Sequence, residues 1–102
     1  MPYYQTISYH QAAALLHSGH CRIVDVREPE EYLAGHLNGA INIPLHTLTR
    51  RAPLLLPSRG RPILVYCAEA ARSLPAVQVL SYMGYTQLYQ LRGGYCAGLR
   101  FL

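Results

Sequence analysis

The stretch Pro62-Ile-Leu-Val-Tyr66 is the most apolar run of the chain, and Cys67 follows it directly. A short apolar run with β-branched residues is typical of a strand that is buried on both faces of a sheet. Apolar residues then recur at helical spacing from Leu74 to Met83, and Gly84 ends the pattern. The sequence therefore predicts a buried strand, a short turn that begins at Cys67, and a helix.

The rest of the chain continues this alternation of strands and helices. Ser8 and Gln11 have the spacing of a capping box, and Pro29 suits the first turn of a helix. We therefore expect an α/β fold with a mostly parallel central sheet of about five strands, flanked by helices on both faces, in one domain over residues 1–102. The other expected segments are a helix over residues 9–17, a strand over 22–26, a helix over 30–34, a strand over 40–43, a weaker helix over 45–51 bounded by Pro53 and Pro57, a loop over 57–62, a strand over 87–91, and a short terminal helix after Gly94.

The composition is that of a globular protein, because 51% of the 102 residues are apolar and 14% are charged. All nine basic residues are arginines and five residues are acidic, so the formal net charge of +4 favours small anions as ligands. The arginines are scattered, so no nucleic-acid partner is expected. No apolar stretch has the ~20 residues that cross a bilayer, and the first residues lack the pattern of a signal peptide. We expect a cytoplasmic location and no membrane partner.

Cys67 lies where ligands bind in open α/β sheets, outside the carboxyl end of a central strand. It opens a six-residue segment, Cys67 to Arg72, that leads directly into the predicted helix. Unpaired N–H groups and the positive end of the helix dipole face such a residue, and they favour a thiolate over a thiol. A thiolate needs no separate base. The sequence therefore predicts Cys67 as the catalytic residue.

The rest of this segment is predicted to bind the substrate. Its N–H groups can stabilise the negative charge of a persulfide or an oxyanion, and the Arg72 guanidinium suits an anionic substrate. This chemistry requires a thiol that solvent can reach. The alternative is that Cys67 is a buried structural cysteine and that Arg72 only stabilises the start of the helix. The predicted substrate-binding residues are Ala68, Glu69, Ala70, Ala71 and Arg72.

Three segments, in order along the chain, resemble the signatures of the rhodanese homology domain, a family of sulfurtransferases. They are Asp25-Val-Arg-Glu28 with Glu31-Tyr32, Gly35-His-Leu37 and Gly39-Ala-Ile-Asn-Ile-Pro44; then Tyr66-Cys67 with Arg72-Ser73; and then Leu91-Arg-Gly93-Gly94. The resemblance spans nearly the whole chain. It implies that the Cys67 thiolate attacks the outer sulfur of a donor such as thiosulfate and releases sulfite. The persulfide then passes its sulfur to cyanide or a thiol.

The length of the loop and two of its residues bear on this implication. In the family, a six-residue loop typically goes with sulfur transfer, whereas a loop one residue longer goes with phosphatases and arsenate reductases. Ala70 occupies a position where the family usually has glycine, and alanine resists the positive φ that glycine accepts. Glu69 adds a carboxylate that would oppose a dianionic donor, so we expect slow turnover of thiosulfate.

Other polar residues are interpreted as structural. Asp25, Arg27 and Glu28 tie a strand to a helix in the family pattern rather than acting on a substrate. The two histidines and the cysteine of residues 17–21 have a spacing seen in metal sites, but no fourth ligand can be placed, so no metal and no cofactor is expected. Cys96 is interpreted as a small buried helix residue, with a role as a resolving thiol as the alternative.

The sequence is compatible with three functions. The first is a sulfurtransferase of the thiosulfate type that acts on a small sulfur-containing anion or on a low-molecular-weight thiol or persulfide, with a sulfur-relay protein as a further candidate partner. The second is a catalytically weak binding or sensory module, which Ala70 and Glu69 favour. The third is an arsenate reductase or phosphatase relative, and the length of the loop argues against it.

Overall fold

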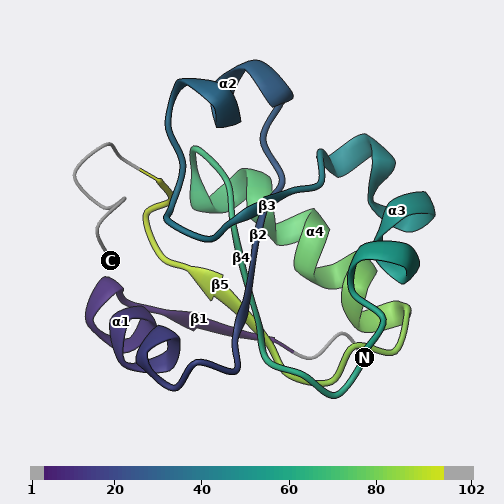
Figure 1. Cartoon of the computed structure of the whole chain (residues 1–102), viewed down its shortest axis with the longest axis horizontal. Coiled ribbons are helices and arrows are strands. Elements are labelled where there is room, and N and C mark those ends of the chain that lie inside the picture. Colours follow the sequence, from purple (N-terminus) through teal and green to yellow (C-terminus); the bar gives the residue numbers. More distant parts are fainter. Residues whose placement is uncertain (1–3, 96–102) are drawn as a thin grey trace.

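The computed structural model describes residues 4–95, except for the side chains of residues 70–72. Its centre is a five-stranded sheet in which every neighbouring pair of strands is parallel (Figure 1). The strand order is β1-β5-β4-β2-β3, so β4 occupies the middle. The predicted α/β fold is confirmed. The strands are β1 (Gln5–Ile7), β2 (Arg22–Asp25), β3 (Ile41–Asn42), β4 (Ile63–Tyr66) and β5 (Leu88–Leu91).

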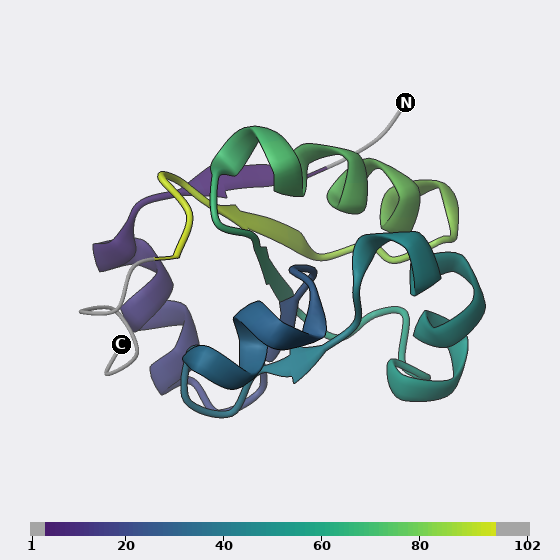
Figure 2. The same ribbon diagram turned by 90° about the horizontal axis from the view of Figure 1, so that it is seen from above.

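Helices lie on both faces of this sheet, as the alternation of elements predicts (Figure 2). One core cluster joins the sheet to α1 through residues such as Ala12, and a second joins it to α3 and α4 through residues such as Leu48 and Leu80. The helices are α1 (Tyr9–His17), α2 (Pro29–Ala34), α3 (Leu48–Leu55), which follows a 3-10 turn η1 (Leu45–Thr47), and α4 (Ala70–Tyr82).

The middle strand β4 is buried along its whole length. Its side chains alternate between the two core clusters: Leu64 and Tyr66 point to the α1 side, whereas Ile63 and Val65 point to the side of α3 and α4. This alternation follows from the two-residue period of a strand. Cys67 continues it and belongs to the cluster of α3 and α4.

Local sequence signals place the first helix where it was predicted. The Ser8 hydroxyl accepts a hydrogen bond from the Gln11 backbone N–H at 3.2 Å, and the Gln11 side chain accepts one from the Ser8 N–H at 2.9 Å. This capping box satisfies two backbone donors that a helix start leaves without partners. Pro29 is the first residue of α2, where its missing N–H costs nothing.

One strand was not expected, one helix extends beyond its predicted end, and one expected segment lies outside the described residues. β1 was not located from the sequence. The weaker helix was expected to stop before Pro53, but α3 continues through it to Leu55. Proline removes only one backbone donor from the helix. The last turn keeps a hydrogen bond, since the Leu56 N–H donates to Ala52 O at 2.7 Å. The terminal helix predicted after Gly94 falls mostly outside the described residues.

Candidate active site

Cys67 is the first residue after β4, at the carboxyl edge of the sheet. β2 and β5 flank β4 on its two sides, and α4 begins at Ala70 (Figure 1). The chain therefore runs from strand to turn to helix within a few residues, as the sequence predicts. This arrangement brings Cys67 and the backbone of Ala68 to Arg72 into one continuous segment.

The Cys67 thiol is enclosed, because only 2% of the residue is exposed. It belongs to the same core cluster as Val26 and Val77. The expectation that solvent can reach this thiol is therefore wrong for this conformation. The backbone of Cys67 is tied to a distant stretch of the chain, since the Tyr95 N–H donates a hydrogen bond to Cys67 O at 2.8 Å. A substrate can touch the sulfur only after a local opening of the residues that enclose it.

The turn after Cys67 leaves backbone donors without partners. The N–H groups of Ala68 and Glu69 have no hydrogen-bond acceptor within residues 4–95. Glu69 is the N-cap residue of α4, yet its side chain makes no capping hydrogen bond to the first turn. Free N–H groups and the positive end of a 13-residue helix thus lie beside the thiol. Such a setting stabilises an anion.

The backbone at Ala70 accommodates alanine. Ala70 is the first residue of α4, and no residue other than glycine has a positive φ in the part of the chain that is described. The expected conflict between alanine and a left-handed backbone is therefore absent. Half of the predicted six-residue loop, Ala70 to Arg72, is already the first turn of the helix. The side chains of these three residues lie outside the description, so the role of Arg72 stays a prediction.

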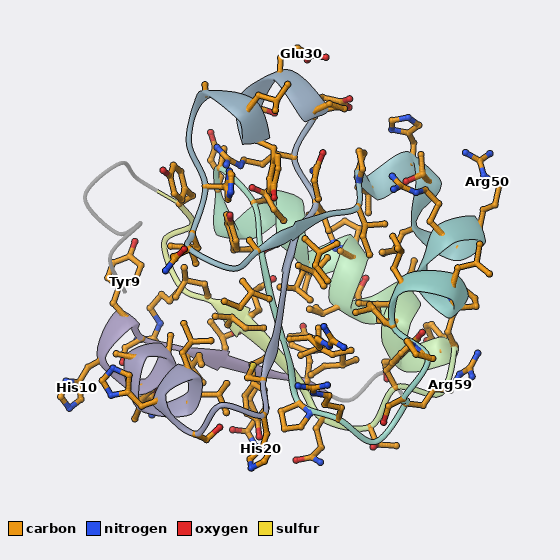
Figure 3. The ribbon with its side chains drawn as sticks, in the orientation of Figure 1. Tyr9, His10, His20, Glu30, Arg50 and Arg59 are labelled. Carbon is orange, nitrogen blue, oxygen red and sulfur yellow. The ribbon has the colours of Figure 1, made fainter. Side chains whose placement is uncertain are left out.

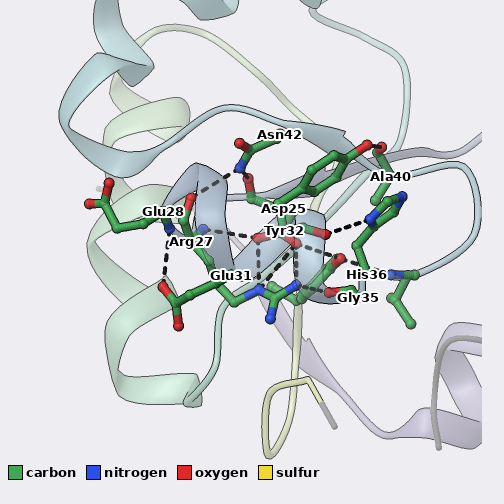
Figure 4. Close-up of polar contacts among 11 residues, drawn as sticks. Asp25, Arg27, Glu28, Glu31, Tyr32, Gly35, His36, Ala40 and Asn42 are labelled. Atoms are coloured by element: carbon green, nitrogen blue, oxygen red, sulfur yellow. Dashed lines mark hydrogen bonds and ion pairs between the residues drawn. The ribbon is translucent and has the colours of Figure 1, made fainter. Parts of the chain in front are cut away.

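Asp25, Arg27 and Tyr66 form a buried polar network beside the site, shown in part in Figure 4. The Asp25 carboxylate accepts hydrogen bonds from the Arg27 backbone N–H, Nε and Nη2 at 2.7–3.1 Å. It also accepts one from the Tyr66 hydroxyl at 2.8 Å, and that hydroxyl in turn accepts one from the Leu37 N–H at 3.0 Å. Arg27 Nη2 donates to Gly35 O at 2.6 Å. These contacts support the structural interpretation of Asp25 and Arg27.

The ionisation of this network follows from its burial. Desolvation raises the pKa of Tyr66, and its hydrogen bond to Asp25 acts in the same direction, so the phenol stays neutral. For Arg27, burial opposes the charge, but the hydrogen bonds and the attraction of Asp25 outweigh it and raise the pKa further. Asp25 and Arg27 therefore neutralise each other's charge. Few of their hydrogen-bonding groups remain free to bind a substrate.

The other cysteine that the structure describes has a different environment. Cys21 is half-buried, and desolvation raises the pKa of its thiol to about 11. Its Sγ donates to Arg22 O at 3.3 Å. Cys21 is therefore protonated at neutral pH and a poor nucleophile. Cys96, the third cysteine of the sequence, lies outside the described residues.

The part of the chain that the structure describes contains neither a cluster of metal ligands nor a helix able to span a membrane. Within residues 4–95, no three histidine, cysteine or acidic residues lie close enough together to hold a metal ion. No helix in this part of the chain has both the length and the apolar character to span a bilayer.

The sequence did not reveal the contact of Tyr95 with Cys67. The only signal for it is the Gly93-Gly94 pair just before Tyr95, which allows close approach of two backbones.

Comparison with known proteins identifies the family. Residues 8–99 match the model of the rhodanese-like domain. The chain is 40% identical over 74 residues to the uncharacterized protein YqhL of Bacillus subtilis, covering 72% of this chain and 57% of YqhL. It is 40% identical over 70 residues to the thiosulfate sulfurtransferase PspE of Escherichia coli, covering 69% of this chain and 67% of PspE.

A solved structure extends the likeness over the whole chain. The human single-domain sulfurtransferase TSTD1 superposes with a TM-score of 0.81 at 29% identity, covering 100% of this chain and 98% of that one. The parallel sheet, the cysteine after its middle strand and these matches lead to one conclusion. The chain belongs to the rhodanese-like domain family and is related to its sulfurtransferases.

Proposed function

We propose that this protein moves sulfane sulfur from a donor such as thiosulfate to cyanide or a thiol through a persulfide on Cys67. The observation that carries the proposal is the position of Cys67, between the end of β4 and the uncapped start of α4, beside free N–H groups. Helix starts and free amides stabilise negative charge, and every form of the sulfur in this reaction is anionic. The relation to PspE supports the same chemistry.

The reaction has two displacement steps at sulfur. In the first, the Cys67 thiolate attacks the outer sulfur of thiosulfate, a new S–S bond forms, and sulfite leaves with the electron pair of the bond that breaks. In the second, cyanide or an acceptor thiolate attacks the outer sulfur of the persulfide. Thiocyanate or a new persulfide leaves, and the Cys67 thiolate is restored. Neither step needs a metal, an external oxidant or a separate base.

The enclosed thiol limits how the donor approaches. With 2% of Cys67 exposed, the residues of the core cluster that enclose it must move before the sulfur can be attacked. A small donor needs a smaller opening than a protein does. We therefore expect a small sulfur-containing anion, a low-molecular-weight thiol or a persulfide as the first partner, with a sulfur-relay protein as an acceptor that needs a wider opening.

Mass spectrometry after exposure to donor tests the proposal. The protein is treated with thiosulfate or a low-molecular-weight persulfide, and digested peptides are measured without reduction. We expect a gain of one sulfur on the Cys67 peptide and none on the Cys21 peptide, because the Cys21 thiol has a pKa of about 11 and stays protonated. Cys67→Ser is the matched control and should take up no sulfur there. An unchanged Cys67 peptide with every donor would refute sulfur transfer.

The enclosed thiol favours one alternative, a binding or sensory module that keeps the fold but turns over little substrate. Its expected signature is wild-type turnover no greater than that of Cys67→Ser across several donors and acceptors. The third function, that of an arsenate reductase or phosphatase relative, was disfavoured by the length of the loop, and no contact among the described residues favours it.

A further inference from the structure

The segment after β5 runs across the turn that carries Cys67. We call residues 92–95 the strap. Figure 2 shows it as the yellow end of the described chain, between α1 and the start of α4. Its first residue is tied to the sheet, because the Arg92 N–H donates to Ile7 O at 2.8 Å. Its last residue is fixed from another side, since the Arg27 guanidinium carbon lies 4.3 Å from the centre of the Tyr95 ring.

A side chain from α1 holds the middle of the strap. The Tyr9 hydroxyl donates a hydrogen bond to Gly94 O at 3.0 Å, across 85 residues of sequence. In Figure 3, Tyr9 extends from the start of α1 toward this part of the chain. The fit is close, because a Cβ added to Gly93 would lie 2.8 Å from the Tyr9 hydroxyl. Tyr9 therefore fixes the strap from outside the turn that holds Cys67.

The strap in turn fixes one peptide group, the one that joins Cys67 to Ala68. The Tyr95 N–H donates to the carbonyl oxygen of this group at 2.8 Å. The Gly94 backbone packs against this group and the next one, since an added Cβ would lie 2.9 Å from Cys67 O and 2.7 Å from the Ala68 carbonyl carbon. Gly94 also has a φ of +74°, which favours glycine. No larger residue fits at Gly94 without displacing this peptide group or the strap.

The direction of the next amide follows from peptide geometry. The structure holds no cis peptide bond within residues 4–95, and in a trans peptide the C=O and N–H point in opposite directions. Because Tyr95 holds the Cys67 carbonyl, the Ala68 N–H must point away from the strap. That N–H has no acceptor among the described residues. It is thus free for an anion in the turn.

We infer that Tyr9 and the strap are positioning elements of the active site: they hold the Cys67–Ala68 peptide so that the Ala68 N–H faces the anionic sulfur. Tyr9 and Gly94 act only through the backbone of the strap and of the turn, and neither is assigned a contact with the reacting sulfur. The inference rests on the proposed function only in taking Cys67 as the reacting group. It predicts that a phenol on α1 controls the reactivity of a thiol at the end of β4.

Gly94→Ala is the direct test, and the readout is the pH profile of Cys67 alkylation by iodoacetamide, followed by peptide mass spectrometry. Loss of one charge-assisted N–H donor should shift the profile upward by about one pH unit, a tenfold change. Gly39→Ala is the matched control, because Gly39 also has a positive φ, +85°, but an added Cβ there meets nothing within 4 Å. Its profile should match that of the wild type.

Tyr9→Phe is the gentler test and keeps the inference falsifiable if Gly94→Ala does not fold. It removes only the hydroxyl, so we expect an upward shift of about 0.3 unit, a twofold change. The control is Tyr32→Phe, which removes the hydrogen bond from the Tyr32 hydroxyl to Ala40 O at 2.7 Å, away from the strap. The charged and ionisable residues of the segments around Cys67 stay the same in every variant: Asp25, Arg27, Tyr66, Glu69, Arg72, Arg92 and Tyr95.

The outcomes separate this inference from the proposed function. A strap that merely covers the thiol would give faster alkylation in Gly94→Ala at every pH, with no shift of the profile, and the inference would be wrong. Equal shifts in Tyr9→Phe and Tyr32→Phe would also overturn it. If the shifts appear but the wild type takes up no sulfur from any donor, the positioning stands and sulfur transfer fails. If sulfur is taken up and the profiles do not move, the reverse holds.

Discussion

Two turns at the same edge of the sheet treat their polar groups in opposite ways. The turn after β2 is saturated: the Asp25 carboxylate accepts hydrogen bonds from Arg27 and from Tyr66. The turn after the adjacent strand β4 is not, because the N–H groups of Ala68 and Glu69 have no acceptor within residues 4–95. A turn whose polar groups satisfy one another supports the fold, whereas one that leaves donors free can hold a ligand.

The largest expected effect on stability comes from a substitution in the turn after β2, whose polar groups are paired with one another. Asp25→Ala leaves the buried Arg27 guanidinium without its counter-charge and the Tyr66 hydroxyl without its acceptor, and it should lower the free energy of unfolding by about 3–5 kcal/mol. Urea denaturation followed by far-UV circular dichroism measures this. Glu30→Ala, at an exposed carboxylate of the helix α2 that follows, should change it by less than about 0.5 kcal/mol. Similar values for the two variants would mean that the buried pair does not hold this turn.

A substitution that removes one hydroxyl from the same network should have an intermediate effect on stability. Tyr66→Phe leaves the Leu37 N–H without its acceptor and should cost about 1–3 kcal/mol in urea denaturation. Burial raises the pKa of Tyr66 above its ordinary value of 10.0, so the unfolded chain releases this proton first as the pH rises. Wild-type stability should therefore fall above about pH 10 more steeply than that of Tyr66→Phe. Parallel pH curves would show that the phenol ionises equally in both states.

The smallest expected effect concerns the open turn. Glu69 is exposed beside the free amides, so its repulsion of dianionic thiosulfate is screened by solvent. Glu69→Ser should lower the KM for thiosulfate by no more than about fivefold, the equivalent of a surface charge interaction. Glu30→Ser on α2 is the control and should leave the KM as it is. An unchanged KM in both variants would show that the Glu69 carboxylate faces away from the donor.

Much of this comparison was accessible from the sequence, because it depends on local patterns. The capping box at Ser8 and the apolar run before Cys67 each fix an element through residues close in sequence. β1 escaped detection because Gln5 and Thr6 are exposed polar residues. Only its pairing with β5, more than 80 residues away in sequence, makes it a strand.

The site was predicted to a similar degree. The position of Cys67 at the end of the middle strand follows from the order of elements, and the structure confirms that position. Its enclosure does not follow, because Cys67 packs in one cluster with residues from other elements, such as Val26, and nothing near Cys67 in sequence specifies that packing. The hold of Tyr9 on Gly94 O was hidden for the same reason.

The strand order also bears on how the chain is made. β5 is the last of these five strands to leave the ribosome, yet in the sheet it lies between β1 and β4. β1, the first of them to be made, has β5 as its only neighbour in the sheet formed by the described residues, so it must wait unpaired until residues 88–91 have emerged. The sheet is therefore completed only after its fifth strand has been made. A nascent chain that stalls before residue 88 leaves two strands without the partner that β5 provides, β1 and β4.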